Sequence, residues 1–155
     1  MKSSKFKQVL FLCSGNYYRS RFAEILFNHH AHERDLNWRA ISRGLSREIG
    51  PWKTGPISVY ALAGLSERGL EPPEPHREPL YCTEDDLTTA DIVIALKEAE
   101  HRPMVTKLFP NLDHRVEYWH IHDIDAAKPE TALAELEQLL WALIHRLQQS
   151  TTQAP

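Results

Sequence analysis

Cysteine is scarce in this chain: two of its 155 residues are cysteine. Two cysteines cannot form a disulfide framework, so we expect a protein of a reducing compartment, the cytoplasm. The sequence has no apolar run long enough to span a membrane, and the run at Val9–Leu12 is too short for a signal peptide. It also has no large excess of charge, because the net charge is −3, which argues against nucleic-acid or membrane partners.

The rest of the composition is that of an ordinary globular protein, with 42% hydrophobic and 25% charged residues. A chain of 155 residues suits one domain with a sizeable core. The sequence contains no internal repeat that would indicate an array. We therefore predict a single domain over residues 1–149 and a disordered tail over residues 150–155. The sequence does not indicate an oligomeric state.

The most informative stretch lies near the N-terminus, where an apolar strand leads through a turn into a helix. Val9–Leu12 is a short, continuous apolar run, as expected for a buried parallel strand. The residues Ser14, Gly15 and Asn16 adopt tight or left-handed turns at low cost. A helical repeat follows the turn, at Phe22, Ile25, Leu26 and His29.

This turn has the features of a phosphate-binding loop that carries a nucleophile. Backbone N–H groups of such a loop can point at one anion, and the helix N-terminus adds positive potential. Arg19 offers a fork that can bind two oxygens of a phosphate. The same surroundings favour the thiolate of Cys13, which is the reactive form of a cysteine. We therefore predict attack on phosphorus; the alternative is an inert buried cysteine followed by a solvated arginine.

The remaining chain alternates between strand and helix patterns. Further strands are predicted at 38–42, 92–96 and 115–121, the last of them at an edge of the sheet. Helices are predicted at 57–68, after a capping box at 83–86, at 103–109 with Pro103 in the first turn, and at 129–149. This alternation predicts an α/β three-layer sandwich, with about four parallel strands and helices on both faces. Ligands bind at the carboxyl ends of such strands, and Cys13 lies there.

Clustered histidines raise the question of a metal site. The run His29-His30-Ala31-His32 is better explained as a polar helix end, because no cysteine or carboxylate cluster supports a site there. His120 and His122 have a spacing that suits a metal but lack a third ligand. We therefore predict neither a metal nor another cofactor.

The stretch Cys13–Ser20 resembles the signature loop of the low-molecular-weight protein tyrosine phosphatases, C-x-G-N-x-x-R-S. The resemblance extends over about residues 7–147 and implies a flavodoxin-like fold with strand order 2-1-3-4. It implies Cys13 as the nucleophile, with Ser20 stabilising the sulfur as a leaving group. It also implies that the phosphate is bound by Ser14, Gly15, Asn16, Tyr17, Tyr18, Arg19 and Ser20.

The resemblance also implies roles for residues outside the loop. The family's general acid is an aspartate in a D-P motif after the last strand, which corresponds to Asp123, although Ile124 replaces the proline and Asp125 is the alternative acid. His76 corresponds to a histidine that holds the loop asparagine. Trp52 corresponds to the aromatic wall beside the mouth of the family's active site; the alternative for Trp52 is packing on the rim of the core. Tyr17 and Tyr18 depart from the family as a bulky aromatic pair, and they either line the mouth, with Tyr17 as part of the substrate wall, or partly obstruct it.

Two departures from the family limit the possible functions. Tyr18 replaces a second cysteine that protects the nucleophile in many members, and Cys82 is the only other thiol. The related arsenate reductases need a triple-cysteine relay, so that activity is disfavoured. We predict a phosphatase that hydrolyses phosphotyrosine or other aryl or small phosphomonoesters through a cysteinyl-phosphate. Its partner would be a phosphorylated protein or a small aryl phosphate; the alternative is a catalytically weakened phosphate- or phosphotyrosine-binding module.

Overall fold

The computed structural model describes residues 6–46 and 53–152. In this part of the chain one parallel sheet contains the strands β1 (Lys7–Cys13), β2 (Trp38–Gly44), β3 (Ile92–Ala95) and β4 (Val116–Tyr118). The strand order is β2-β1-β3-β4, with all three pairings parallel. The predicted α/β fold with order 2-1-3-4 is therefore confirmed, and β1 lies inside the sheet, where its carboxyl end has a strand on each side.

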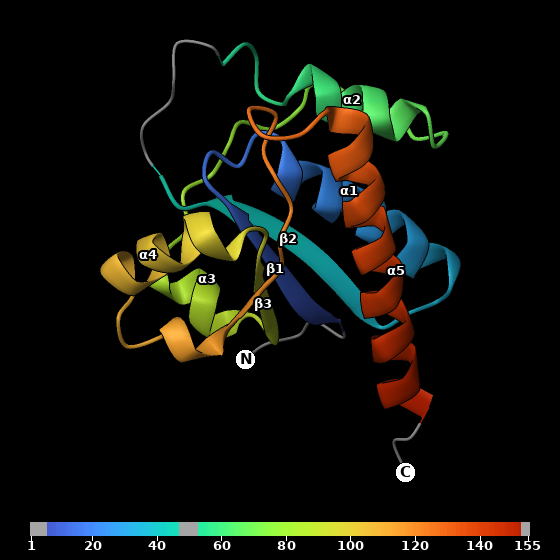
Figure 1. Cartoon of the computed structure of the whole chain (residues 1–155). Helices are drawn as coiled ribbons and strands as arrows, with labels where there is room; N and C mark the ends of the chain where they lie inside the picture. The colour runs from blue at the N-terminus through green and yellow to red at the C-terminus, as the bar shows by residue number, and fades with distance from the viewer. Residues whose placement is uncertain (1–5, 47–52, 153–155) are drawn as a thin grey trace.

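Helices cover both faces of this sheet (Figure 1). One face packs against α1 (Arg19–Glu33), α2 (Val59–Ser66) and α5 (Pro129–Thr152). The other face packs against α3 (Glu84–Thr89) and α4 (Glu98–Leu108), and the 3-10 turn η1 (Asp113–Arg115) leads into β4. Helix α5 continues past the predicted end at Gln149 to Thr152.

The alternation of side chains along β1 separates the two halves of the core. Val9 and Phe11 are buried in the cluster with α1 and α5, whereas Leu10 and Leu12 are buried in the cluster with α3 and α4. All four are fully buried, which explains the continuous apolar run. Helix α1 buries a slightly different face from the predicted one, because Ile25 is only partly buried and Phe27 takes a place in the core.

Helix α4 differs from the prediction in a way that matters for the site. It begins at Glu98, so Pro103 lies inside the helix and not in its first turn. The start is stabilised from within the helix, because the Lys97 backbone N–H donates to His101 Nδ1 over 3.0 Å. The predicted capping box of α3 is confirmed, with reciprocal hydrogen bonds between Thr83 and Asp86. No helix in residues 6–46 and 53–152 has both the length and the hydropathy of a membrane span.

Candidate active site

The loop between β1 and α1 is held by the segment that continues β2. Gly44 pairs with Cys13 in the sheet. The Leu45 N–H lies 2.9 Å from the Cys13 carbonyl oxygen and 3.0 Å from that of Ser14, and the Ser46 N–H donates to the Ser14 carbonyl over 2.9 Å. The first carbonyl groups of the loop are therefore turned toward this neighbouring segment.

Asn16 holds the middle of the loop in shape. It has a left-handed backbone with φ of 51° and is fully buried. Its amide nitrogen donates to the hydroxyls of Ser20 and Ser42, each over 2.9 Å. Its amide oxygen accepts from Arg77 Nη1 over 3.0 Å and from the Leu80 N–H over 2.9 Å. An amide has two donor hydrogens and two acceptor lone pairs, so these four contacts satisfy it.

The contact that the resemblance implied for His76 is therefore made by its neighbour Arg77. The Arg77 guanidinium also pairs with Glu24 over 3.0 Å and contacts the Ser42 hydroxyl over 3.0 Å. The prediction of His76 as the support for Asn16 is corrected to Arg77. The physical reason is the length of the arginine side chain, because its forked end contacts the asparagine, the serine and the glutamate from one position.

Cys13 and Ser20 lie together beneath the loop. The Cys13 sulfur is 2.9 Å from the Ser20 hydroxyl oxygen, and both residues are buried. Since Asn16 donates to the same hydroxyl oxygen, the hydroxyl proton of Ser20 remains available to the sulfur. A hydroxyl that donates to the sulfur stabilises a thiolate. The sequence-predicted nucleophile and its serine are thus brought together.

Arg19 is the first residue of α1, and its side chain is 2% exposed. Its Nη1 donates to the Ile121 carbonyl over 3.0 Å and to Glu100 Oε1 over 3.2 Å, and its Nη2 donates to Glu100 Oε2 over 3.0 Å. Burial opposes the charge of the guanidinium, but Cys13 and the carboxylates around it raise the pKa of Arg19. The arginine is therefore a fixed cation beside the sulfur.

Glu100 belongs to this site although the sequence analysis did not identify it. Besides Arg19, its carboxylate accepts a hydrogen bond from the Ser14 hydroxyl and lies 3.3 Å from His101 Nε2. Burial alone would raise the pKa of Glu100, but the hydrogen bonds from His101 and Arg19 outweigh it and hold that pKa well below its usual range. The topology carries a signal for this residue, since the segment after β3 lies at the same sheet edge as Cys13.

The loop that follows β4 brings Asp123, and not Asp125, close to Arg19. Asp123 Oδ2 lies 3.4 Å from Arg19 Nη2, whereas Asp125 is exposed. The backbone carbonyl of Asp123 accepts from the N–H groups of Ala126 and Ala127, and its Oδ1 accepts from the Ile124 N–H over 2.9 Å. The turn therefore holds one carboxylate oxygen of Asp123, and the other oxygen faces Arg19. The turn forms although Ile124 stands where the family has a proline.

The two loop tyrosines have different surroundings. The Tyr17 hydroxyl donates to the Thr54 carbonyl over 2.5 Å and accepts from the Thr54 N–H over 3.1 Å, and Lys53 Nζ lies over its ring. Tyr18 is 5% exposed and belongs to the core cluster; burial raises its pKa to about 12. Tyr17 can therefore form part of the cleft wall, and Tyr18 packs inward. Trp52, the other predicted wall residue, lies outside the described residues.

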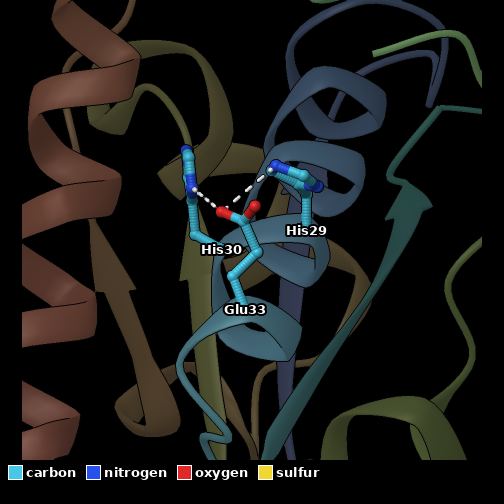
Figure 2. Close-up of side chains that lie close together, drawn as sticks. All are labelled: His29, His30 and Glu33. Carbon is cyan, nitrogen blue, oxygen red and sulfur yellow. Dashed lines mark ion pairs between the residues drawn. The ribbon is translucent and has the colours of Figure 1, made fainter. Parts of the chain in front are cut away.

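A second cluster lies at the far end of α1 (Figure 2). The carboxylate of Glu33 is 3.3 Å from His29 Nε2 and 3.8 Å from His30 Nδ1, and the His30 ring stacks on Trp141 of α5. Among the described residues these three form a group that could hold a metal, with donor atoms within 4.8 Å of one another. A zinc ion bonds each donor at about 2.0–2.2 Å, so the widest of these separations requires side-chain movement. Burial lowers the pKa of His30, and we interpret the cluster as a polar helix end, separate from the phosphate loop.

Comparisons with known proteins agree with this geometry. The family model described as low molecular weight phosphotyrosine protein phosphatase matches residues 8–152. A low molecular weight protein tyrosine phosphatase from T. tengcongensis is 26% identical, with a TM-score of 0.75 over 90% of this chain and 99% of that one. YfkJ from Bacillus subtilis is 21% identical, with a TM-score of 0.79 over 96% and 99% of the two chains.

A third similar structure is named for a different substrate. The YwlE arginine phosphatase from Geobacillus stearothermophilus is 24% identical, with a TM-score of 0.76 over 96% of this chain and 97% of that one. At this identity the likeness concerns the fold alone. No curated protein matches the sequence significantly.

Proposed function

The chain belongs to the low molecular weight phosphotyrosine protein phosphatase family and is a phosphatase, and from this premise we propose that it hydrolyses aryl phosphomonoesters, phosphotyrosine among them, through a cysteinyl-phosphate. The observation that carries the proposal is that Cys13 and Arg19 of the phosphate loop and Asp123 of the distant segment after β4 come together at the carboxyl ends of the strands. A phosphorylated protein or a small aryl phosphate would be the substrate.

In the first step the Cys13 thiolate attacks phosphorus in line with the leaving oxygen. The S–P bond forms as the P–O bond breaks, and the leaving oxygen takes a proton from Asp123. Arg19 and the backbone N–H groups of the loop bind the three equatorial oxygens, where negative charge develops. The 3.4 Å contact between Asp123 and Arg19 supports this assignment, because the acid lies next to the guanidinium that would bind the phosphate.

In the second step Asp123, now ionised, takes a proton from a water molecule that attacks phosphorus. The S–P bond breaks, inorganic phosphate forms, and the thiolate of Cys13 is regenerated. The hydroxyl of Ser20, 2.9 Å from the sulfur, stabilises the charge that returns to it. Asn16 and Arg77 take no part in proton transfer and hold the loop.

Tyr17 supports an aryl substrate. Its hydroxyl is fixed by two hydrogen bonds to Thr54, and Lys53 Nζ lies over its ring, so an aromatic side chain is held at the edge of the loop. Because structural relatives include proteins named arginine phosphatases, phosphoarginine is the informative competing substrate. A preference for phosphoarginine over phosphotyrosine would overturn the proposed substrate class and leave the two-step chemistry standing.

The test is hydrolysis of p-nitrophenyl phosphate between pH 4 and 8 in the presence of EDTA. We expect no turnover for Cys13→Ser and a fall of about 10²–10⁴-fold for Asp123→Asn, the range for loss of a general acid. Asp125→Asn is the matched control, with the same chemical change two residues along, and we expect it to retain activity. Loss in Asp125→Asn with retention in Asp123→Asn would move the acid to Asp125.

A phosphorus NMR signal from a phosphocysteine, trapped by acid quenching during turnover, tests the intermediate directly. Wild type that binds vanadate without turnover would replace the enzyme with a phosphate-binding module. Wild type that neither turns over nor binds an oxyanion would overturn the assignment of the loop.

A further inference from the structure

We propose that Glu100 is a positioning residue for oxyanion binding, which acts by fixing the guanidinium of Arg19; this inference rests on the proposed phosphatase function. Glu100 is not part of the loop motif, and it lies 81 residues from Arg19 in the sequence. Its carboxylate nevertheless makes two hydrogen bonds to the arginine of the phosphate loop. Any mechanism in which Arg19 binds the phosphate therefore has to explain why a carboxylate is already bound to it.

The contact uses one particular edge of the guanidinium. Glu100 binds end-on, with its two oxygens on Nη1 and Nη2. A guanidinium offers a second bidentate edge, formed by Nε and Nη2, because its donors form a planar fork. The Ile121 carbonyl also binds Nη1, so the contacts concentrate on the end of the group. Glu100 and Ile121 thus leave the side edge, where Asp123 Oδ2 lies 3.4 Å from Nη2, as the edge for a phosphate, and Glu100 fixes the plane in which it lies.

Glu100 is itself fixed. The Ser14 hydroxyl donates to it from the phosphate loop, and His101 Nε2 lies 3.3 Å away. His101 Nδ1 accepts the Lys97 N–H, which leaves the proton of a neutral imidazole on Nε2, facing Glu100. His101 is fully buried, and burial lowers its pKa, so it stays in this neutral form. The carboxylate is therefore oriented by the first turn of α4.

Burial makes this partner necessary. An arginine that is 2% exposed has lost most of its hydration, and an unpaired buried charge is strongly unfavourable. Without Glu100 the guanidinium would turn toward Asp123, which lies 3.4 Å from Nη2. That rotation would remove the side edge from the substrate and tie up the general acid. Glu100 thus keeps the arginine and the acid available at once.

An opposite role is conceivable on the same contacts, because an anion on Arg19 could also compete with phosphate. The two roles predict opposite signs for the same substitution. Loss of a positioning residue weakens oxyanion binding, whereas loss of a competitor strengthens it. Anchoring of Glu100 by a helix turn and a buried histidine favours positioning, since a displaceable group needs freedom to move.

The experiment compares Glu100→Gln with Glu98→Gln in the full chain. Both residues lie in the first turn of α4, and both changes remove one negative charge, but Glu98 pairs with Arg102 on the surface. We expect Glu100→Gln to lower kcat/KM for p-nitrophenyl phosphate by about tenfold to a hundredfold, the value of one or two hydrogen bonds to a charged group. The inhibition constant for vanadate should rise by a similar factor. Glu98→Gln should match wild type in both.

Three further readouts separate positioning from other roles. The pH profile of Glu100→Gln should keep both of its limbs, because Glu100 stays ionised and transfers no proton. Glu100→Asp restores the charge and should recover part of the loss. If Glu100→Gln fails to fold, Ser14→Ala removes only one hydroxyl that holds Glu100 and should weaken vanadate binding in the same direction.

The outcomes distinguish this inference from the proposed function. Wild type without turnover or oxyanion binding would overturn both. An active wild type in which Glu100→Gln behaves like Glu98→Gln would overturn only the inference, and so would tighter vanadate binding in Glu100→Gln. Loss of the alkaline limb in Glu100→Gln, on which a proton donor becomes deprotonated, would make Glu100 the proton donor in place of Asp123.

Discussion

Substitution of Gly44 by alanine tests whether β2 holds the phosphate loop in its active shape. A Cβ built on Gly44 would lie 2.9 Å from the Ser14 carbonyl oxygen, 3.2 Å from the Asn16 nitrogen and 3.2 Å from the Gly15 carbonyl carbon. All three are backbone atoms of the loop, so no side chain can rotate away to make room. The added methyl group must therefore move either β2 or the loop.

The structure indicates that in Gly44→Ala the phosphate loop would shift and β2 would stay in place. Gly44 is fixed on its other edge, because its N–H donates to the Leu80 carbonyl and its carbonyl accepts the Cys82 N–H, each over 2.8 Å. Ordinary van der Waals contact begins at 3.4 Å, so the carbonyl of Ser14 has to shift by about half an ångström. A displacement of about 1 Å at a reacting group can lower a rate about a hundredfold, so we expect kcat/KM to fall by about tenfold. Overpacking should also lower the free energy of unfolding by about 1–3 kcal/mol.

The assay is p-nitrophenyl phosphate turnover and vanadate inhibition, with thermal unfolding recorded on the same samples. Gly64→Ala is the matched control, because its Cβ would contact side-chain atoms of Leu133 and Phe22, away from the loop. It should change Tm and leave kcat/KM near that of wild type. Wild-type kcat/KM and vanadate affinity in Gly44→Ala would refute the reasoning, since the loop would then tolerate the shift.

Three further predictions concern the supports of the loop and the core. Arg77→Ala should lower kcat/KM and destabilise the fold by about 1–2 kcal/mol, because the Asn16 amide oxygen loses one of its donors; kinetics and urea unfolding measure both. Thr83→Ala removes the capping box with Asp86 and should lower the free energy of unfolding by about 1 kcal/mol, with activity unchanged. Burial raises the pKa of Cys82 to about 12, whereas an unfolded thiol ionises near 8.5, so the stability that it contributes is present below about pH 8.5 and lost as pH rises toward 12. Between pH 8 and 10 this loss is about 2 kcal/mol, and Cys82→Ala should remove it from urea-unfolding curves.

Each of these has a result that contradicts it. Wild-type kinetics in Arg77→Ala would show that Asn16 keeps its orientation through its other partners. A fall in activity in Thr83→Ala would show that the start of α3 influences the site. An unchanged slope of stability against pH in Cys82→Ala would mean that the thiol is no less accessible to ionisation in the native state.

The parts of the fold that follow from local pattern could be predicted. The apolar run at Val9–Leu12 and the capping box at Thr83 each depend on residues within one element, and the structure has both. The loop motif places Cys13 and Ser20 close together because strand end and helix start are covalently joined. A proline was a less dependable sign of where a helix begins. Pro103 lies inside α4, and the helix begins at Glu98.

The residues that could not be predicted are those whose role depends on long side chains from distant segments. Nothing in the local pattern around Arg77 distinguishes it from His76, and only the folded structure shows that its fork reaches Asn16 and Glu24. Glu100 was hidden for a second reason. Because the sequence predicts the helix at 103–109, Glu100 was expected in the loop before it, where the pattern does not indicate which way a side chain points.

These two unpredicted residues have opposite charges and hold opposite parts of one loop. Glu100 fixes Arg19 and Ser14, whereas Arg77 fixes Asn16. Their charges bear on the chemistry, because a negatively charged phosphate must enter a site in which the carboxylate of Glu100 already pairs with Arg19. Asp123 also lies 3.4 Å from Arg19, so two carboxylates already surround the guanidinium that would bind the phosphate. Arg77 supplies a positive charge to the other part of the loop, where it pairs with Glu24 and donates to Asn16.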